Sequence, residues 1–312
     1  IDAIKGKKNV NIFVLHPDNR VSPVQRKLMT TGKDENVFNI AIKGNFDDCQ
    51  NLVKSMFADK KFSNDIKMSG VNSINWARII AQSVYYFYSY LSVEDASEPT
   101  NFSVPTGNFG DVYAGYLAKK MGLPIDKLIV ATNQNDILHR AISKGSYEAE
   151  KVSETISPSM DIQIASNFER LIFDLNNGDD QQTSLDMKNI KEKGQYLIND
   201  DKLNKISENF LSARMSEDET LEVIKNVYEK FAVVLDPHTA IGYGAFDKHN
   251  LKGNNIVLAT AHPCKFPGAI QSAINVKAEL PNELTFILDQ KENYDIVEND
   301  IEKVKQHIKD RT

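Results

Sequence analysis

The most constraining feature of the sequence is a repeated alternation of short apolar runs with segments of helical periodicity. Each run has the length of a buried strand, and a segment with apolar residues three or four positions apart follows within a few residues. The runs are residues 10–15, 37–42, 102–104, 128–132 and 255–260, and the helical segments include 22–31, 45–58, 73–91 and 112–121. Such an alternation is typical of parallel sheets, because parallel strands need crossover connections. The pattern predicts an α/β protein with parallel sheets covered by helices.

The chain is long enough for two domains. Its 312 residues exceed the usual size of one domain. We expect residues 1–65 to belong to a small α/β domain and residues 66–312 to form a larger one. Residues 176–218 are polar, which indicates surface helices and loops inserted into the larger domain. The last residues, 294–311, have the pattern of an amphipathic surface helix.

Composition excludes several classes of protein. Hydrophobic residues make up 41% and charged residues 26%, which argues against disorder. The net charge of −6 provides no basic excess for a nucleic-acid backbone. The uncharged stretch 79–93 is shorter than the roughly 20 residues that cross a bilayer, so we expect no membrane span. Cys49 and Cys264 form no CxxC pair, which indicates neither a metal site nor a disulfide and fits the reducing cytoplasm.

The most informative motif is the glycine-containing turn Thr106-Gly107-Asn108-Phe109-Gly110-Asp111, between a predicted strand and a predicted helix. The first N–H groups of a helix have no internal partner and carry partial positive charge, so this turn is a candidate phosphate site. The motif is neither a Walker A loop nor GxGxxG. The alternative is a turn whose glycines serve geometry alone.

Two further segments contain candidate ligand-binding residues. Thr260 follows an apolar run, and the carboxyl ends of such strands line ligand crevices in α/β proteins. Residues 72–78 open an apolar helix with polar side chains, among them Arg78, whose guanidinium matches phosphate oxygens. The alternatives are that Thr260 satisfies the backbone, that Ser73 caps the helix and that Arg78 forms a surface ion pair. His238 lies on a predicted turn and could contact a substrate or cap that turn.

Together these segments resemble threonine synthase, a fold-type-II pyridoxal 5′-phosphate enzyme with a fold like that of the tryptophan synthase β subunit. The similar segments occur in the family's order along nearly the whole chain. They are residues 20–31, 45–50, 72–88, 104–124, 128–140, 157–162, 166–171, 236–242 and 260–267. The resemblance implies a lyase of threonine biosynthesis that converts O-phospho-L-homoserine and water to L-threonine and phosphate. A non-catalytic paralogue that binds the cofactor or a phosphorylated amino acid and a related phospholyase remain alternatives.

The resemblance also implies which residues contact the cofactor and the substrate. The residues implied for the cofactor phosphate are Gly107, Asn108, Phe109 and Asp111. Thr260 would face the pyridine nitrogen of pyridoxal phosphate. For the phosphate of the substrate, charge and motif position make Arg78 the first candidate, followed by Arg20, and Asn75 is a further candidate for substrate binding. The sequence does not indicate an oligomeric state.

The resemblance fails at the residue that would bind the cofactor covalently. The family's Schiff-base lysine lies in a Phe-Lys-Asp segment, and a Ser-Gly-Asp-Thr-Gly loop holds the reacting amino acid; neither segment is present in this sequence. We therefore expect that the chain lacks an N-terminal portion on the order of 100 residues. We also expect no catalytic lysine within this chain, and no turnover by the chain alone.

Overall fold

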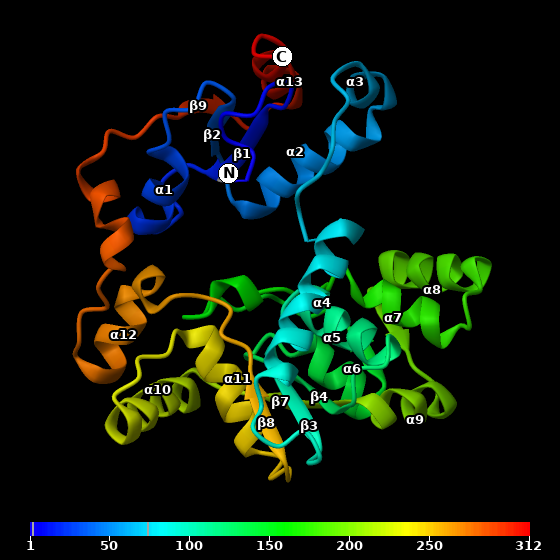
Figure 1. The fold of residues 1–312 in the computed structure, drawn as a ribbon. Helices are drawn as coiled ribbons and strands as arrows, with labels where there is room; N and C mark the ends of the chain where they lie inside the picture. Colours follow the sequence, from blue (N-terminus) through cyan, green and yellow to red (C-terminus); the bar gives the residue numbers. More distant parts are fainter. Residues whose placement is uncertain (2, 74) are drawn as a thin grey trace. The chain divides into compact units, whose positions relative to one another are not determined.

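The computed structural model describes residues 1–312 apart from residues 2 and 74, and every described side chain except that of residue 47. The described residues form two compact units. The first comprises residues 1–70 and 279–312, and the second comprises residues 71–278 (Figure 1). Each unit has its own parallel sheet, as the alternating sequence pattern predicts.

The first unit is built on a parallel sheet of order β1-β2-β9. Its strands are β1 (Ile12–Pro17), β2 (Val37–Lys43) and β9 (Asp295–Glu298). Its helices are α1 (Pro23–Thr30), α2 (Phe46–Ala58), α3 (Lys60–Asp65), the 3-10 helix η3 (Asn282–Asp289) and α13 (Ile301–Lys309). Ile40 and Ile42 of β2, Met56 of α2 and Val304 of α13 form its apolar core. Asn45 begins α2 with a capping box that includes Asp48.

The division of the chain differs from the predicted one. We expected the C-terminal residues in the larger domain, but β9 pairs in parallel with β2, and Val304 and Ile308 are buried in the core of the first unit. The surface helix predicted for residues 294–311 is therefore only partly correct. Residues 295–298 form the strand β9, and the apolar face of α13 is covered by the core of the first unit. The strand was missed because its four residues, of which Ile296 is 55% exposed, form no apolar run.

The second unit is built on a parallel sheet of order β7-β4-β3-β8. Its strands are β3 (Thr100–Pro105), β4 (Ile125–Thr132), β7 (Phe210–Arg214) and β8 (Asn254–Val257). A separate antiparallel pair consists of β5 (Ser146–Glu148) and β6 (Gln195–Leu197). The helices are α4 (Trp76–Leu91), α5 (Gly110–Lys120), α6 (Ile137–Lys144), η1 (Pro158–Met160), α7 (Phe168–Leu175), α8 (Asp180–Lys193), α9 (Asp200–Asn209), α10 (Glu217–Phe231), α11 (Pro237–Asp247), η2 (Pro263–Lys265) and α12 (Pro267–Ile274).

Helices cover both faces of this sheet. Leu128 and Val130 of β4 belong to a core that includes residues of α4, α5 and α7. The alternate residues Ile129 and Ala131 belong to a second core with Ile241 of α11. Since successive side chains of a strand point to opposite faces, both faces of β4 are buried. This burial explains why the strand reads as a continuous apolar run.

The polar segment is only partly an insertion. Residues 176–218 contain α8 and α9, as expected for surface helices, but they also contain β7, which pairs with the central strand β4. Phe210 is fully buried at the start of β7. The strand escaped prediction because its sequence, FLSAR, is short and mixes apolar with polar residues. No helix within the described residues is long and apolar enough to span a membrane.

Candidate functional site

Parallel pairing brings the loops that follow the sheet strands of the second unit to one edge. Thr106, after β3, donates its main-chain N–H to Ala131 of β4, and Met215, after β7, donates to Thr132. Leu258, after β8, donates to Ser103 of β3. The carboxyl edge of an open parallel sheet is where such folds bind ligands. The glycine turn, after β3, and the segment after β8 therefore begin at the same edge. Thr260 lies three residues beyond the end of β8, so the expectation that it ends the strand is wrong.

The glycine turn ends in an uncapped helix. Phe109 is the N-cap of α5 and adopts the left-handed conformation, with φ 64°, and no side chain caps the helix. Its ring is fully buried between Phe168 and Phe210, at centroid distances of 5.2 and 5.8 Å. Burial of the ring thus fixes a backbone conformation that a bulky residue otherwise avoids. Among the described groups, the main-chain N–H of residues 107–112 have no hydrogen-bond acceptor. This helix end suits an anion.

Both glycines of the turn are closely packed. Neither has a positive φ. A Cβ on Gly107 would lie 2.7 Å from the carbonyl oxygen of Ser159, and a Cβ on Gly110 would lie 3.2 Å from Asn167 Nδ2. The geometric alternative from the sequence thus explains the glycine at position 107, where the added Cβ would meet backbone; at position 110 the side chains of Ile79 and Asn167 would have to shift slightly. The close packing at these glycines does not explain why the main-chain N–H groups of residues 107–112 have no acceptor among the described groups.

The carboxyl group of Asp111 lies against Tyr86. The buried Tyr86 hydroxyl donates to the main-chain oxygen of Asp111 at 2.8 Å and approaches Oδ1 at 3.2 Å. Burial raises the pKa of Asp111 to about 6, and the hydrogen bond from Tyr86 offsets part of that rise. An ionised carboxylate would repel a phosphate, so what Asp111 can offer an anion is its main-chain N–H.

Asn108 is held by the residues that precede α7. Its main-chain oxygen accepts hydrogen bonds from the main-chain N–H of Asn167, at 3.0 Å, and from Asn167 Nδ2, at 3.2 Å. Its side-chain Oδ1 accepts from the hydroxyl of Ser166 at 3.1 Å. The turn is therefore fixed from one side by a neighbouring segment.

Sequence reasoning missed a polar network beside the turn. Asp161 accepts hydrogen bonds from Asn133 Nδ2 at 2.8 Å, from Asn135 Nδ2 at 2.9 Å and from Thr155 Oγ1 at 2.6 Å. The network fixes the loop whose Ser159 carbonyl lies over Gly107. The sequence feature that could have indicated this network is the pair Asn133 and Asn135, which follows the apolar run 128–132 at the carboxyl end of a predicted strand.

His238 serves the same loop. Its imidazole is buried, hydrogen-bonds Asp236 Oδ1 through Nδ1 at 2.9 Å and accepts from the main-chain N–H of Ser159 through Nε2 at 3.3 Å. Asp236 also caps α11. The expected turn is wrong, since His238 lies in the first turn of α11 and Asp236 provides the cap; the imidazole of His238 instead holds the loop beside the glycine turn.

The segment before α4 lies next to the turn. Asn167 Nδ2, which contacts Asn108, also donates to the main-chain oxygen of Ser73 at 2.9 Å. The alternative that Ser73 caps α4 is wrong, because Asn75 caps this helix by accepting a hydrogen bond from the main-chain N–H of Ala77 at 2.9 Å. Residue 74, within this motif, lies outside the described residues.

The predicted ligand-binding residues outside the glycine turn are only partly brought together. Arg78 is exposed and donates to the main-chain oxygen of Val71 at 3.2 Å, and it takes no part in the ion pairs found among the described residues. Thr260 is exposed three residues after β8 ends. Arg20 is exposed after β1 and belongs to the first unit, so the site built here does not include it.

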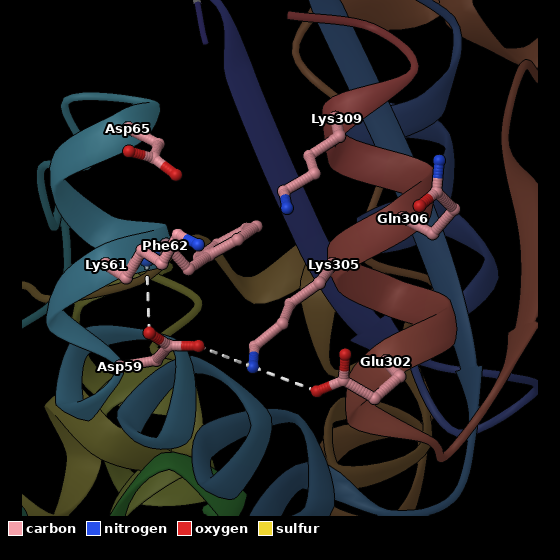
Figure 2. A pocket seen from close by; sticks show the side chains of 8 residues that line it. All are labelled: Asp59, Lys61, Phe62, Asp65, Glu302, Lys305, Gln306 and Lys309. Carbon is pink, nitrogen blue, oxygen red and sulfur yellow. Dashed lines mark hydrogen bonds and ion pairs between the residues drawn. The ribbon is translucent and has the colours of Figure 1, made fainter.

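A surface cavity of about 160 Å³ lies in the first unit, between α3 and α13 (Figure 2). Lys305 Nζ bridges Asp59 Oδ2, at 2.8 Å, and Glu302 Oε1, at 3.0 Å, and lies over the ring of Phe62. Lys305, Asp59 and Glu302 are thus paired with one another across the cavity. In the described part of the chain, no cluster of His, Cys, Asp and Glu has the arrangement of a metal site.

Comparisons with known proteins identify the family. The family described as "Threonine synthase, C-terminal" matches residues 239–308. Threonine synthases from Pseudomonas aeruginosa and Schizosaccharomyces pombe are 44% and 41% identical over 99% and 97% of this chain, which covers 66% and 67% of their lengths. The crystal structure of the PLP-bound threonine synthase from Brucella melitensis matches with a TM-score of 0.95 and 46% identity, over all of this chain and 67% of its own.

The yeast threonine synthase structure also matches over the whole chain, with a TM-score of 0.90 and 42% identity. The chain spans about two thirds of the length of these relatives. The close structural agreement confirms the fold predicted from the resemblance. The chain belongs to the threonine synthase family.

Proposed function

We propose that the protein is a pyridoxal-phosphate-dependent threonine synthase, which converts O-phospho-L-homoserine and water to L-threonine and phosphate. The observation that carries the proposal is the uncapped N-terminus of α5, which opens at the carboxyl edge of the sheet. The relatives support the reaction, and the Brucella melitensis structure, with pyridoxal phosphate bound, supports the cofactor.

The main-chain N–H groups of residues 107–112 would hold the phosphate of the cofactor. They have no other acceptor among the described groups, and the α5 dipole adds favourable electrostatics. Gly107, Asn108, Phe109 and Asp111 thus act through their backbone. The side chains of Phe109 and Asp111 contact the protein interior and fix where these N–H groups point.

Thr260 would face the pyridine nitrogen. When bound, pyridoxal phosphate supplies an electron sink for carbanions at the α and β carbons of the substrate. An aspartate would keep a proton on that nitrogen, whereas the neutral hydroxyl of a threonine does not. The pyridine ring is therefore a milder electron sink. Such a sink favours elimination over transamination. Thr260 is accessible for this contact, since it is exposed beyond β8.

Arg78 is the first candidate for the substrate phosphate. Its guanidinium is exposed, and its helix begins beside the glycine turn through the Asn167 contacts. Asn75 fixes the start of that helix as its cap. Arg20 is the second cationic candidate, from the first unit.

This chain contains no match to the Phe-Lys-Asp segment that provides the Schiff-base lysine in the family. We therefore propose that the chain described here binds the cofactor phosphate but does not turn over substrate by itself. Both cysteines are free and buried, which supports a cytoplasmic location.

Product analysis tests the reaction. The protein purified from its natural source is incubated with pyridoxal phosphate and O-phospho-L-homoserine, and threonine, phosphate and 2-oxobutanoate are quantified. We expect threonine and phosphate in equal amounts. Formation of 2-oxobutanoate in place of threonine would identify a phospholyase, and cofactor binding without any product would identify a non-catalytic paralogue.

A further inference from the structure

Asn167, which precedes α7, joins two segments that the sequence places far apart. Its side chain is fully buried. Its Nδ2 donates to the oxygen of Ser73 at 2.9 Å and to the oxygen of Asn108 at 3.2 Å. Its main-chain N–H donates to the same oxygen of Asn108 at 3.0 Å. One residue therefore contacts both the glycine turn and the segment before α4.

The remaining polar atom of this side chain is also used. Asn167 Oδ1 accepts a hydrogen bond from Arg170 Nε at 3.0 Å, and the Arg170 guanidinium lies 5.2 Å from the centre of the Trp76 ring. With one acceptor and two donors engaged, the orientation of the amide is determined. Aspartate has the same shape but no donor for the two carbonyl groups.

The contact to Asn108 sets the direction of the next N–H group. In a planar trans peptide the C=O of one residue and the N–H of the next point in opposite directions. Because Asn167 holds the C=O of Asn108, the N–H of Phe109 points away from Asn167. The N–H groups that follow belong to the same helix end, so their direction follows from this peptide.

We infer that Asn167 is a positioning residue for the cofactor phosphate. It holds the N–H groups of the turn in the direction that a phosphate requires and couples them to the segment that ends in Arg78. The inference rests on the proposed function, because it assumes that a phosphate binds at α5. Asn167 is not proposed to touch either ligand; it acts through Asn108 and Ser73.

The test compares Asn167→Asp with Asn101→Asp. Asn101 of β3 is equally buried, and its Nδ2 also donates to two oxygens, those of Lys252, at 3.0 Å, and Asn255, at 2.9 Å. It lies at the amino end of β3, opposite the turn. Both variants place a carboxylate against two acceptors, so both should lose stability. Only Asn167→Asp should change the site.

Amide exchange measures the positioning without any ligand. Two main-chain hydrogen bonds report on the segments that Asn167 holds: Tyr113 N–H to Phe109 at the start of α5, and Ile79 N–H to Asn75 at the start of α4. In Asn167→Asp we expect both amides to exchange about tenfold faster than in Asn101→Asp. Exchange at both amides equal to that of Asn101→Asp would overturn the inference.

Ligand titration measures the consequence. Isothermal titration calorimetry measures binding of pyridoxal phosphate, inorganic phosphate and pyridoxal to each variant. We expect Asn167→Asp to weaken binding of the two phosphates about tenfold and to leave pyridoxal, which has no phosphate, unchanged. Unaltered phosphate affinity in Asn167→Asp would refute the positioning role.

The two measurements separate the inference from the proposed function. Absence of pyridoxal phosphate binding to the unsubstituted chain would count against the proposed function, while amide exchange would still decide the role of Asn167 in holding both segments. Should Asn167→Asp not fold, Asn167→Ala removes the same Nδ2 donor without burying a carboxylate, and Asn101→Ala is its control. The same faster exchange and weaker binding are then expected of Asn167→Ala.

Discussion

The carboxyl group of Asp111 is expected to make the protein less stable as the pH rises. Burial raises its pKa from 3.8 to about 6 in the folded state. Between these values the folded protein binds a proton more tightly than the unfolded chain does. The free energy of unfolding therefore falls as the pH rises through this window, and the full loss is reached above about pH 6.

The size of the loss follows from the same difference. From 3.8 to about 6, at roughly 1.4 kcal/mol for each pKa unit, the ionised carboxylate costs about 3 kcal/mol. Asp111 lies in the first turn of α5, where the helix dipole returns up to about 1 kcal/mol. Asp111→Asn removes the charge and keeps an acceptor for Tyr86. We expect it to raise the free energy of unfolding by about 2 kcal/mol at pH 7.5 and by about 0.5 kcal/mol or less at pH 4.

Urea unfolding followed by circular dichroism at several pH values measures this difference. The control is Asp126→Asn, at an exposed position of β4, where a change within about 0.5 kcal/mol is expected at every pH. A gain from Asp111→Asn that is equal at pH 4 and pH 7.5, or a loss at pH 7.5, would refute the reasoning about burial.

Three further substitutions test the site. Gly107→Ala should lower the free energy of unfolding by about 1–3 kcal/mol and weaken pyridoxal phosphate binding, because the added Cβ would lie 2.7 Å from the main-chain oxygen of Ser159. The control is Gly268→Ala, whose added Cβ meets no atom within 4 Å, and equal effects of the two substitutions in thermal unfolding would contradict the packing argument. In the active enzyme, Arg78→Ala should raise the KM for O-phospho-L-homoserine about 30-fold, equivalent to about 2 kcal/mol, and a KM within error of wild type would remove Arg78 from the site. Thr260→Asp should raise the proton affinity of the pyridine nitrogen and divert the enzyme to side reactions, whereas unchanged kinetics and spectra would exclude the role given to Thr260.

Local sequence patterns predicted the elements that are buried on both faces. The run 128–132 is apolar because β4 has helices on either side, and the turn 106–111 was recognisable because glycines separate a strand from a helix. The strands β7 and β9 were not predictable in this way. They are short and carry polar residues, and only their pairing with β4 and β2 makes them strands.

Contacts between distant segments explain the rest of the differences at the site. Nothing near Asp111 in the sequence indicates that Tyr86 holds its carboxyl group, or that Asn167 lies on the turn 59 residues before it. Asn75 caps α4 in place of Ser73, whose carbonyl is held by Asn167. The resemblance to threonine synthase predicted the position of the site; the structure shows that the main-chain N–H groups of residues 107–112 have no acceptor among the described groups.

The most direct test of the account is an NMR titration of the ¹⁵N-labelled chain with pyridoxal phosphate, read at the main-chain amides of residues 107–112. These N–H groups have no acceptor among the described groups, so a bound phosphate should accept hydrogen bonds from them and move their proton resonances downfield. We expect their chemical shifts to change more than those of the other main-chain amides. Binding with shifts confined to other parts of the chain, such as the cavity between α3 and α13, would contradict the claim that the start of α5 holds the cofactor phosphate.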